Sequence, residues 1–194
     1  MRCPVALWRQ RLESNKLACI PCARAAEART AYGRCMIENE ITFREANGAD
    51  VPGIAHVRSS VVENLLTVEQ LASRGITNAS VATSLLTHAK GWVAERKGQI
   101  VAFSIADRAS RSVFALFVLP EYEGRGLGGR LLDLAQQWLW DNGADRVWLS
   151  TGPATKAARF YEGRGWVCVG EEASGDARFE LAQHRAPVGV LRDK

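Results

Sequence analysis

The segment from Val113 to Trp140 constrains the fold of this chain more than any other part of the sequence. It opens with seven apolar residues, Val113 to Leu119, a run that is typical of a strand buried on both faces. Pro120 ends that strand because proline has no N–H to donate to a neighbour. A glycine-rich stretch follows, and apolar residues then recur with helical spacing at Leu127, Leu131, Leu132, Ala135, Trp138 and Leu139. The segment predicts a strand, a glycine-rich turn and an amphipathic helix.

The turn has the features of an anion-binding site. Free N–H groups at a helix start, together with the positive end of the helix dipole, attract phosphate, and glycine lets an anion approach the backbone closely. The alternative is a glycine-rich connection that binds nothing. Each glycine would weaken the helix start by about 0.5–1 kcal/mol relative to alanine. The four glycines concerned are Gly124, Gly126, Gly128 and Gly129. Their cost to helix stability favours a ligand at the turn, without identifying the ligand.

Composition indicates one globular domain with little general affinity for polyanions. The chain has 194 residues, of which 47% are apolar and 24% charged, and its net charge is +4. Residues 1–35 carry seven Lys and Arg against two Glu, whereas the remainder carries 18 basic against 19 acidic residues. The basic charge therefore lies in the first segment, and we expect no nucleic-acid partner. No apolar run approaches the roughly 18 residues that would span a membrane.

The first 35 residues allow several interpretations. They are rich in Arg and poor in acids, as transit peptides are, and Met36 could mark a later start of the chain. A zinc site is a further possibility, but its outer two cysteines would be isolated, so we predict no metal. We favour a poorly packed extension with no role in chemistry. Because only Cys168 lies in the body, a reducing, cytoplasmic location fits best. The zinc ligands would be Cys3, Cys19, Cys22 and Cys35.

The remaining patterns predict an alternation of strands and helices. A strand is expected at 41–44, and helices are expected to begin near Asp50, Thr67 and Asn78. Residues 91–96 and 99–106 form a predicted hairpin across Lys97 and Gly98. After the central strand, turn and helix we expect a strand at 147–149, a helix at 151–162 and an antiparallel pair at 166–169 and 178–181.

Two motifs resemble those of the GCN5-related N-acetyltransferases, the GNAT family, over about residues 41–181. The family's acetyl-CoA signature is Gln or Arg, two residues, Gly, one residue, then Gly or Ala, and it aligns with the segment from Glu123 to Gly128. Its second motif, from Asn through Phe-Tyr to Gly-Phe, is similar to the segment from Ala154 to Trp166. Three positions depart from the pattern: Glu123 replaces Gln or Arg, Ala154 replaces Asn, and Trp166 replaces Phe.

The resemblance implies an α/β (α+β) fold with a mixed, mostly antiparallel sheet of six to seven strands flanked by helices. It divides the chain into an N-terminal basic extension (1–37), a GNAT domain (38–184) and a C-terminal tail (185–194). It also implies an N-acetyltransferase, an acyltransferase that moves an acetyl group from acetyl-CoA to a primary amine by direct attack in a ternary complex. The acceptor would be a small molecule or a peptide, no membrane is involved, and homodimer formation is left open.

The resemblance assigns the cofactor contacts and one catalytic residue. The pyrophosphate would lie on the amides of the turn with two arginines as charge partners, and the pantetheine arm along the central strand. Tyr161 takes the place of the family's acid toward the thiolate, although with ordinary pKa values full proton transfer would be uphill by about 2 kcal/mol. The cofactor-binding residues would be Leu116, Phe117, Val118, Glu123, Gly124, Arg125, Gly126, Leu127, Gly128, Gly129 and Arg130.

The general base is not assigned by the sequence. An alkyl amine is mostly protonated at pH 7, which costs about 4 kcal/mol before attack. The central strand carries no acid, and Ser150 lies near the place where some family members have one on the next strand. Each candidate is more simply a surface charge or an ordinary histidine: Glu63, Glu69, Asp107, Glu121, His56 and His88.

Two other functions compete with this one. The spacing of Gly124, Gly126 and Gly129 also matches the dinucleotide fingerprint of oxidoreductases, with Asp145 near the expected acid position. That motif should directly follow the first strand of a βαβ unit, whereas here a predicted antiparallel hairpin precedes it. A non-catalytic CoA-binding module, acting in regulation or interaction, is the second alternative, because Ala154 removes one side-chain contact to the cofactor and no base is evident.

Overall fold

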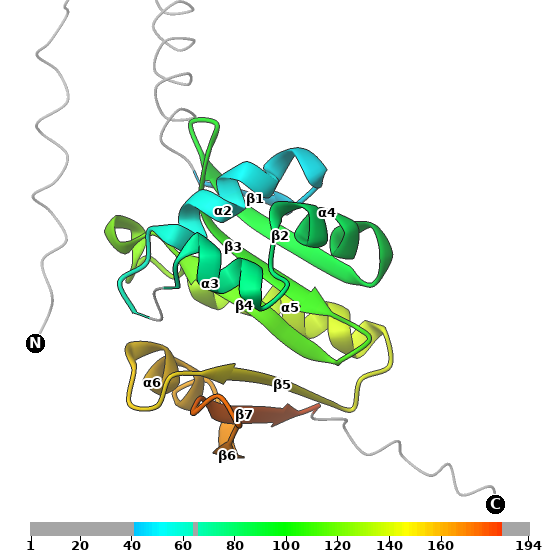
Figure 1. Ribbon diagram of the computed structural model, residues 1–194. Coiled ribbons are helices and arrows are strands. Elements are labelled where there is room, and N and C mark those ends of the chain that lie inside the picture. The colour runs from blue at the N-terminus through cyan, green and yellow to red at the C-terminus, as the bar shows by residue number, and fades with distance from the viewer. Residues whose placement is uncertain (1–40, 64–65, 184–194) are drawn as a thin grey trace, which may run out of the picture. The chain divides into compact units, whose positions relative to one another are not determined.

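A seven-stranded sheet organises the described part of the chain, in the order β1-β2-β3-β4-β5-β7-β6 (Figure 1). The computed structural model describes residues 41–63 and 66–183. All neighbouring strands are antiparallel except β4 and β5, which are parallel. The predicted mixed, mostly antiparallel sheet is thus confirmed. The strands are β1 (Thr42–Glu45), β2 (Ala89–Arg96), β3 (Gln99–Asp107), β4 (Ser112–Val118), β5 (Arg146–Thr151), β6 (Val167–Glu171) and β7 (Ala177–Ala182).

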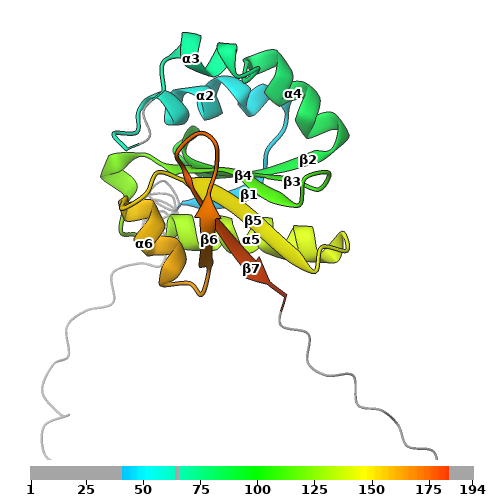
Figure 2. The ribbon, with the colours of Figure 1, turned by 60° about the horizontal axis from the view of Figure 1, so that its bottom comes forward.

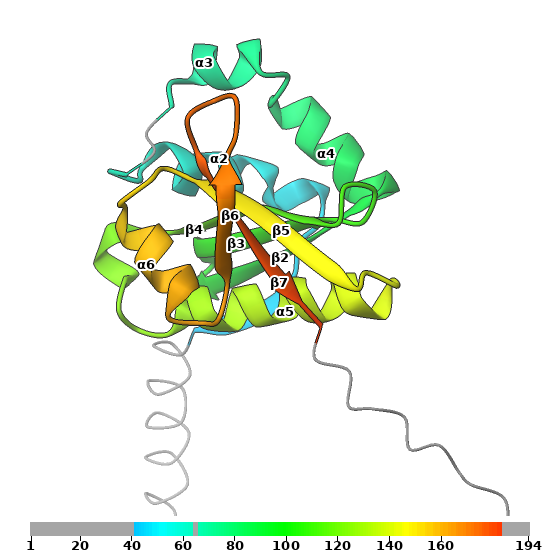
Figure 3. The ribbon, with the colours of Figure 1, turned by 90° about the horizontal axis from the view of Figure 1, so that it is seen from below.

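Helices cover both faces of the sheet (Figure 2). Helices α2, α3 and α4 lie over one face, whereas α5 and α6 lie over the other (Figures 2 and 3). None of the described helices is long and apolar enough to cross a membrane. The α-helices are α2 (Val51–Ser59), α3 (Val68–Ser73), α4 (Asn78–Thr87), α5 (Leu127–Asp141) and α6 (Lys156–Glu162), and the short 3₁₀ helices are η1 (Gly48–Asp50) and η2 (Pro120–Tyr122).

The core forms where α5 packs against the middle of the sheet. The apolar side of α5, including Leu131, Leu132 and Ala135, is completely buried. It contacts β3, whose residues from Val101 to Ala106 are all buried. The hydroxyl of Ser104, the polar side chain in that run, donates to the carbonyl of Leu131 at 3.1 Å, so its burial leaves no unpaired donor. This packing explains why apolar residues recur with helical spacing between Leu127 and Leu139.

The hairpin predicted between residues 91–96 and 99–106 is confirmed by the backbone. Lys97 and Gly98, between β2 and β3, have positive φ angles of 51° and 78°. That combination defines the turn whose twist suits a two-residue hairpin. Asp50 lies at the N-cap position of α2, but its side chain makes no capping hydrogen bond to that helix. Its carboxylate accepts two hydrogen bonds from Arg44 at 2.7 and 2.8 Å and one from the amide of Asn47 at 2.8 Å, and the last of these closes the capping box of η1.

Strands β4 and β5 separate soon after they meet. Their pairing in the described sheet consists of Ser112 opposite Trp148, and the indole of Trp148 donates to the carbonyl of Ser110 at 2.8 Å. Beyond that point β4 stays hydrogen-bonded to β3 alone, while β5 pairs with β7. The sheet therefore has a gap between its fourth and fifth strands, and the open edge of β4 faces it.

Several sequence predictions were wrong in detail. The helix predicted to begin at Thr151 begins at Lys156, because Thr151 still pairs with Ala177 in the sheet and the hydroxyl of Thr155 caps the helix by accepting from the amide of Ala158 at 3.1 Å. The N-cap of α4 is Thr77 rather than Asn78. The central strand is not buried on both faces: Phe114 is 53% exposed, and its side chain lines a cavity beneath the α2–α4 layer.

Candidate active site

The glycine-rich turn between β4 and α5 presents free backbone amides. Gly124 and Gly126 have φ angles of 72° and 80°, in the left-handed region that other residues avoid. Gly126 is the N-cap of α5, and no side chain caps the helix. Within the described residues the amides of Gly124, Arg125 and Gly126 donate no hydrogen bond. A Cβ at Gly124 or Gly126 would meet nothing within 4 Å, so no neighbouring group packs against these two positions of the turn. The turn therefore has the geometry of an anion cradle.

The charged side chains of the turn leave its amides uncovered. The carboxylate of Glu123 lies 3.5 Å from the ammonium of Lys156 at the start of α6, an interaction that offsets its negative charge. The guanidinium of Arg125 lies over the ring of Tyr122 at 5.1 Å and donates to the carbonyl of Glu121 at 2.9 Å. Arg130 lies over the ring of Phe43 at 4.2 Å. Both arginines are exposed.

The end of β4 lies next to this turn. A Cβ on Gly128 would lie 3.6 Å from the side chain of Val118 and 3.8 Å from Phe160, so the first turn of α5 packs on the end of β4 and on α6. The amide of Leu119 donates to the carbonyl of Val101 on β3 at 2.9 Å. Because successive amides along a strand point to opposite sides, the N–H of Val118 faces away from β3, toward the gap beside β5.

Tyr161 on α6 lies in an aromatic cluster with Phe160, Trp166 and Phe179. Its ring centroid lies 5.3 Å from that of Phe160, 5.8 Å from Trp166 and 6.1 Å from Phe179. The side chain is 7% exposed, and it is not among the residues that line the cavity described next. Burial raises the pKa of the phenol above its ordinary value, which makes proton transfer to a thiolate more unfavourable. The hydroxyl thus keeps its proton at neutral pH.

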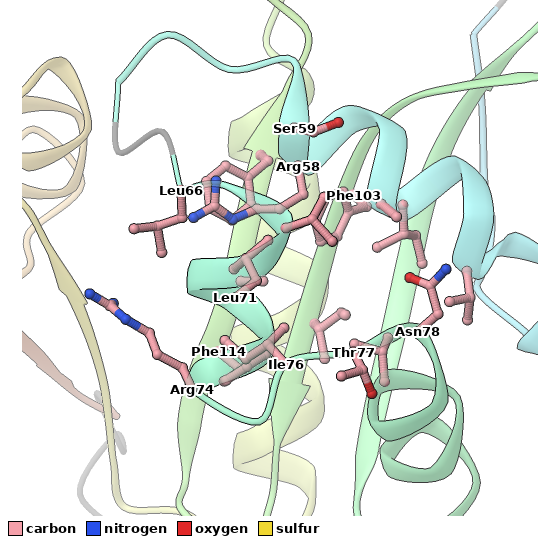
Figure 4. Close-up of a pocket in the computed structure, with 18 of the residues that line it drawn as sticks. Arg58, Ser59, Leu66, Leu71, Arg74, Ile76, Thr77, Asn78, Phe103 and Phe114 are labelled. Carbon is pink, nitrogen blue, oxygen red and sulfur yellow. The ribbon is translucent and has the colours of Figure 1, made fainter.

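A cavity of about 990 Å³ opens between the α2–α4 layer and the sheet, beside the β4–β5 gap (Figure 4). Its walls come from α2, α3, the start of α4, β4, β5 and the turn before β7. Most of the lining is apolar, for example Leu71, Ile76 and Phe114. None of the turn residues from Glu123 to Arg130 lines it. The cavity and the anion cradle are therefore lined by different residues.

Two arginines and one carboxylate line this cavity, and sequence reasoning identified none of them. Arg58 lies at the end of α2, Arg74 follows α3, and Asp176 precedes β7. A signal for Arg58 exists in the sequence, since it sits four residues after Ile54 on the buried face of α2, where a cation is unusual. Nothing local marks Arg74 or Asp176, which are brought to the cavity by the tertiary fold.

The bases considered from the sequence lie mostly elsewhere. Glu63 accepts a hydrogen bond from the amide of Lys156 at 3.0 Å, and Asp107 accepts one from the amide of Ala109 at 2.7 Å. Glu69 is exposed and its pKa is lowered by hydrogen bonds, first from its own backbone and then from Thr67. His56 and Ser150 line the cavity. The other candidates do not line it: Glu63, Glu69, Asp107, Glu121 and His88.

The four cysteines considered as alternative zinc ligands, Cys3, Cys19, Cys22 and Cys35, lie outside the described residues, so the prediction of no metal there stays untested. Within 41–63 and 66–183, no group of three or more His, Cys, Asp or Glu side chains could hold a metal ion. Cys168 on β6 is a free, exposed thiol in the same part of the chain.

The split sheet, the glycine turn and the adjoining cavity define a class of fold that known proteins share. Residues 87–168 match the family description "Acetyltransferase (GNAT) domain". The PaiA N-acetyltransferase from Thermoplasma acidophilum, solved in complex with coenzyme A, has a similar structure: TM-score 0.63, 14% identity, 74% of this chain and 99% of that chain covered. A comparison with curated proteins finds no match.

Two further solved structures show the same fold. The ribosomal-protein-S18-alanine N-acetyltransferase from Escherichia coli has a TM-score of 0.60 at 18% identity, with 78% of this chain and 99% of that chain covered. YncA from Salmonella typhimurium, solved with its cofactor acetyl-CoA, has a TM-score of 0.58 at 19% identity, with the same coverage. The chain has the GNAT fold, and its resemblance to the GCN5-related N-acetyltransferases is confirmed.

Proposed function

We propose that this protein is an acetyl-CoA-dependent N-acetyltransferase that transfers the acetyl group directly to a primary amine in a ternary complex. The observation that carries the proposal is the uncapped start of α5, where the amides of the turn at left-handed Gly124 and Gly126 donate no hydrogen bond and no neighbouring group packs against either glycine. That cradle lies beside the end of β4 and the gap between two strands. The coenzyme A and acetyl-CoA in the structures from Thermoplasma acidophilum and Salmonella typhimurium support the choice of cofactor.

The residues present fit the cofactor. The amides from Gly124 to Gly129 would receive the pyrophosphate, whereas the amide of Glu123 already donates to the carbonyl of Pro120 at 3.2 Å. Arg125 and Arg130 are long enough and exposed enough to reorient toward the pyrophosphate. Glu123 does not oppose an anion strongly, because its carboxylate is paired with Lys156. Leu127 would contribute only its amide, since its side chain is buried in the core. The open edge of β4, with Leu116, Phe117 and Val118, would hold the pantetheine arm.

Acetyl-CoA supplies a thioester carbonyl for attack by the amine and a thiolate as leaving group. Within this chain, the N–H of Val118 faces the gap and would donate a hydrogen bond to the carbonyl oxygen as negative charge develops there. Tyr161 would donate a hydrogen bond to the departing sulfur without losing its proton, because burial raises its pKa. The cavity under α2–α4 would hold the acceptor, shielded from water by its apolar lining.

The amine must lose a proton before attack, and the cavity contains one carboxylate for that role among the described residues. Asp176 lines the wall near β5 and accepts a hydrogen bond from the hydroxyl of Ser174 at 3.0 Å. We assign it, in place of the acids considered from the sequence, as the group that attracts the ammonium form and receives its proton through water.

Isothermal titration with CoA and acetyl-CoA, followed by thiol release against a broad panel of amines, tests the proposal. We expect both cofactors to bind and at least one amine to be acetylated. Binding without acetylation of any amine, and no effect of Tyr161→Phe, would favour a non-catalytic CoA-binding module instead. Failure to bind either cofactor would refute both functions.

A further inference from the structure

The cavity beneath α2–α4 concentrates positive charge in an otherwise apolar space. Arg58 and Arg74 extend from the ends of α2 and α3 toward the same side of the cavity, next to Leu66 and Leu71 (Figure 4). They are close enough to repel each other: after burial, the charge of Arg74 is the second cause that lowers the pKa of Arg58. Arg58 is partly buried whereas Arg74 is exposed, so an anion bound between them would chiefly offset the cost of burying the charge of Arg58.

Arg58 is held in place without an anionic partner. Its guanidinium lies over the ring of Phe117 at 4.5 Å, which fixes its plane. Its Nη1 atom is buried and has no hydrogen-bond acceptor among the described residues. A buried donor that is left unpaired is costly. Because Nη1 itself has almost no accessible surface, an anion in the cavity would approach the guanidinium through its other nitrogens or after a small rotation of the side chain. The Arg74 guanidinium likewise has no ion pair within the described residues.

The position of Arg58 relates this site to the proposed reaction. Phe117, on which it stacks, belongs to the β4 segment assigned to the pantetheine arm, and both side chains line the cavity. Asp176 lines the same cavity from the turn before β7. The cavity thus offers two cations and one carboxylate, a charge pattern complementary to a molecule with an anionic group and an amine.

We propose that the acceptor is a small amino acid-like amine whose carboxylate binds Arg58 and Arg74 while its amine approaches the β4–β5 gap. This deepens the proposed function and depends on it. A carboxylate fits the edge of a guanidinium whose face is already occupied by a ring, because both groups are planar and pair through two parallel hydrogen bonds. The apolar lining, including Leu71, Ile76 and Phe114, would receive a hydrophobic side chain.

Matched pairs of amines that differ only in the anionic group test this proposal. Thiol release would be measured with phenylalanine and phenylalaninamide, with leucine and leucinamide, and with the phosphonate analogue of phenylalanine. Because a charge-assisted pair distinguishes a carboxylate from an amide by roughly 10- to 100-fold, we expect a preference of that size in kcat/KM. Arg58→Met should abolish it, chiefly through KM, and Arg74→Met should reduce it less because Arg74 is exposed.

A binding measurement keeps the test independent of turnover and of cofactor. Calorimetric titration of the full chain, without CoA, would compare N-acetylphenylalanine with N-acetylphenylalaninamide. We expect only the acid to bind, and we expect Arg58→Met to remove that binding while CoA affinity is retained. Arg108→Met is the matched control, since Arg108 is exposed, lies in the turn between β3 and β4, and is not part of the cavity lining.

Each other outcome overturns the proposal. Equal binding of acid and amide, or no binding of either, would show that the arginines do not select a carboxylate. A preference for the phosphonate would replace the carboxylate by a phosphate-like group. An equal loss of CoA affinity in Arg58→Met would assign the arginine to the cofactor. If CoA itself does not bind the wild-type protein, the proposed function fails, whereas binding of the N-acetyl acid would still locate the anion site.

Discussion

A glutamate at either end of α5 separates anion binding at the glycine turn from the general cost of the substitution. Gly126 and Gly143 flank the helix, and their φ angles of 80° and 85° are nearly the same. A Cβ at either position meets nothing within 4 Å. The left-handed conformation costs a non-glycine residue about 1–2 kcal/mol, so both variants should lose similar stability. Gly143→Glu should lose about 0.3–1 kcal/mol more, because it adds a negative charge at the negative end of the helix dipole.

The effect on acetyl-CoA should differ sharply between the two variants. At Gly126 a carboxylate would come within about 5 Å of the pyrophosphate, where two unit charges at an effective dielectric constant of about 20 repel each other by about 3 kcal/mol. Since about 1.4 kcal/mol corresponds to a tenfold change, affinity should fall by at least about 100-fold. Gly143→Glu should bind within about twofold of wild type, since it lies a whole helix away from the turn, beyond the reach of a screened charge.

Calorimetric titration with acetyl-CoA, together with thermal denaturation, measures both effects. Gly126→Gln provides the neutral counterpart and should retain more affinity than Gly126→Glu, with the difference shrinking as salt is added. If Gly126→Glu and Gly143→Glu bind acetyl-CoA equally well, the amides of the turn do not hold the pyrophosphate, and the argument for the cofactor site fails.

Three further predictions address single side chains. Tyr161→Phe should lower thiol release by about tenfold, the value of one hydrogen bond to a developing charge, with CoA affinity unchanged. Because burial raises the pKa of Tyr161, the phenol ionises in the unfolded chain at a lower pH than in the folded one. The free energy of unfolding should therefore fall by up to about 1.4 kcal/mol per pH unit above pH 10. Urea titrations at pH 9 and pH 11 should show a smaller fall in stability for Tyr161→Phe than for the wild type. Hydrogen bonds, first from Arg44, hold the pKa of Asp50 below its usual range, so Asp50→Asn should lower the free energy of unfolding by about 1–2 kcal/mol at pH 7, a value reduced because Arg44 is half-exposed. The difference in stability between wild type and Asp50→Asn should vanish as the pH falls below about 4, because the carboxylate of Asp50 is then protonated. Equal differences at pH 7 and pH 3 would refute this prediction.

The parts of the fold that sequence predicted correctly are those specified by local chemistry. Glycine at a positive φ angle marks the turn at Gly124 and Gly126, and a short hairpin follows from Lys97 and Gly98. Helix α5 follows from the spacing of its buried leucines. These signals act within a few residues, so no knowledge of the rest of the chain is needed to interpret them.

The cavity could not be predicted in this way, because its residues are distant in sequence and meet only through the sheet. Arg58, Arg74 and Asp176 come from three elements that share no local pattern. Phe114 appeared to belong to a buried run, yet it is exposed at the wall of the cavity, whose position depends on the tertiary fold rather than on residue type. The beginning of α6 was wrong for a similar reason, since the pairing of Thr151 with β7 extends the preceding strand.

The gap between β4 and β5 explains why direct transfer suits this architecture better than a covalent acetyl-enzyme. The turn that would hold the cofactor leads into α5, which lies over the opposite face of the sheet from the α2–α4 layer (Figure 2). The proposed acceptor cavity is lined by residues of α2, α3 and the start of α4. Through the gap, two reactants bound on opposite sides can meet at the edge of β4. A covalent relay through a thiolate would require a cysteine there, but Cys168, the one cysteine between residues 41 and 183, lies on the outermost strand β6 and outside the cavity lining. Under the proposed function, both substrates would therefore be bound together when the acetyl group moves.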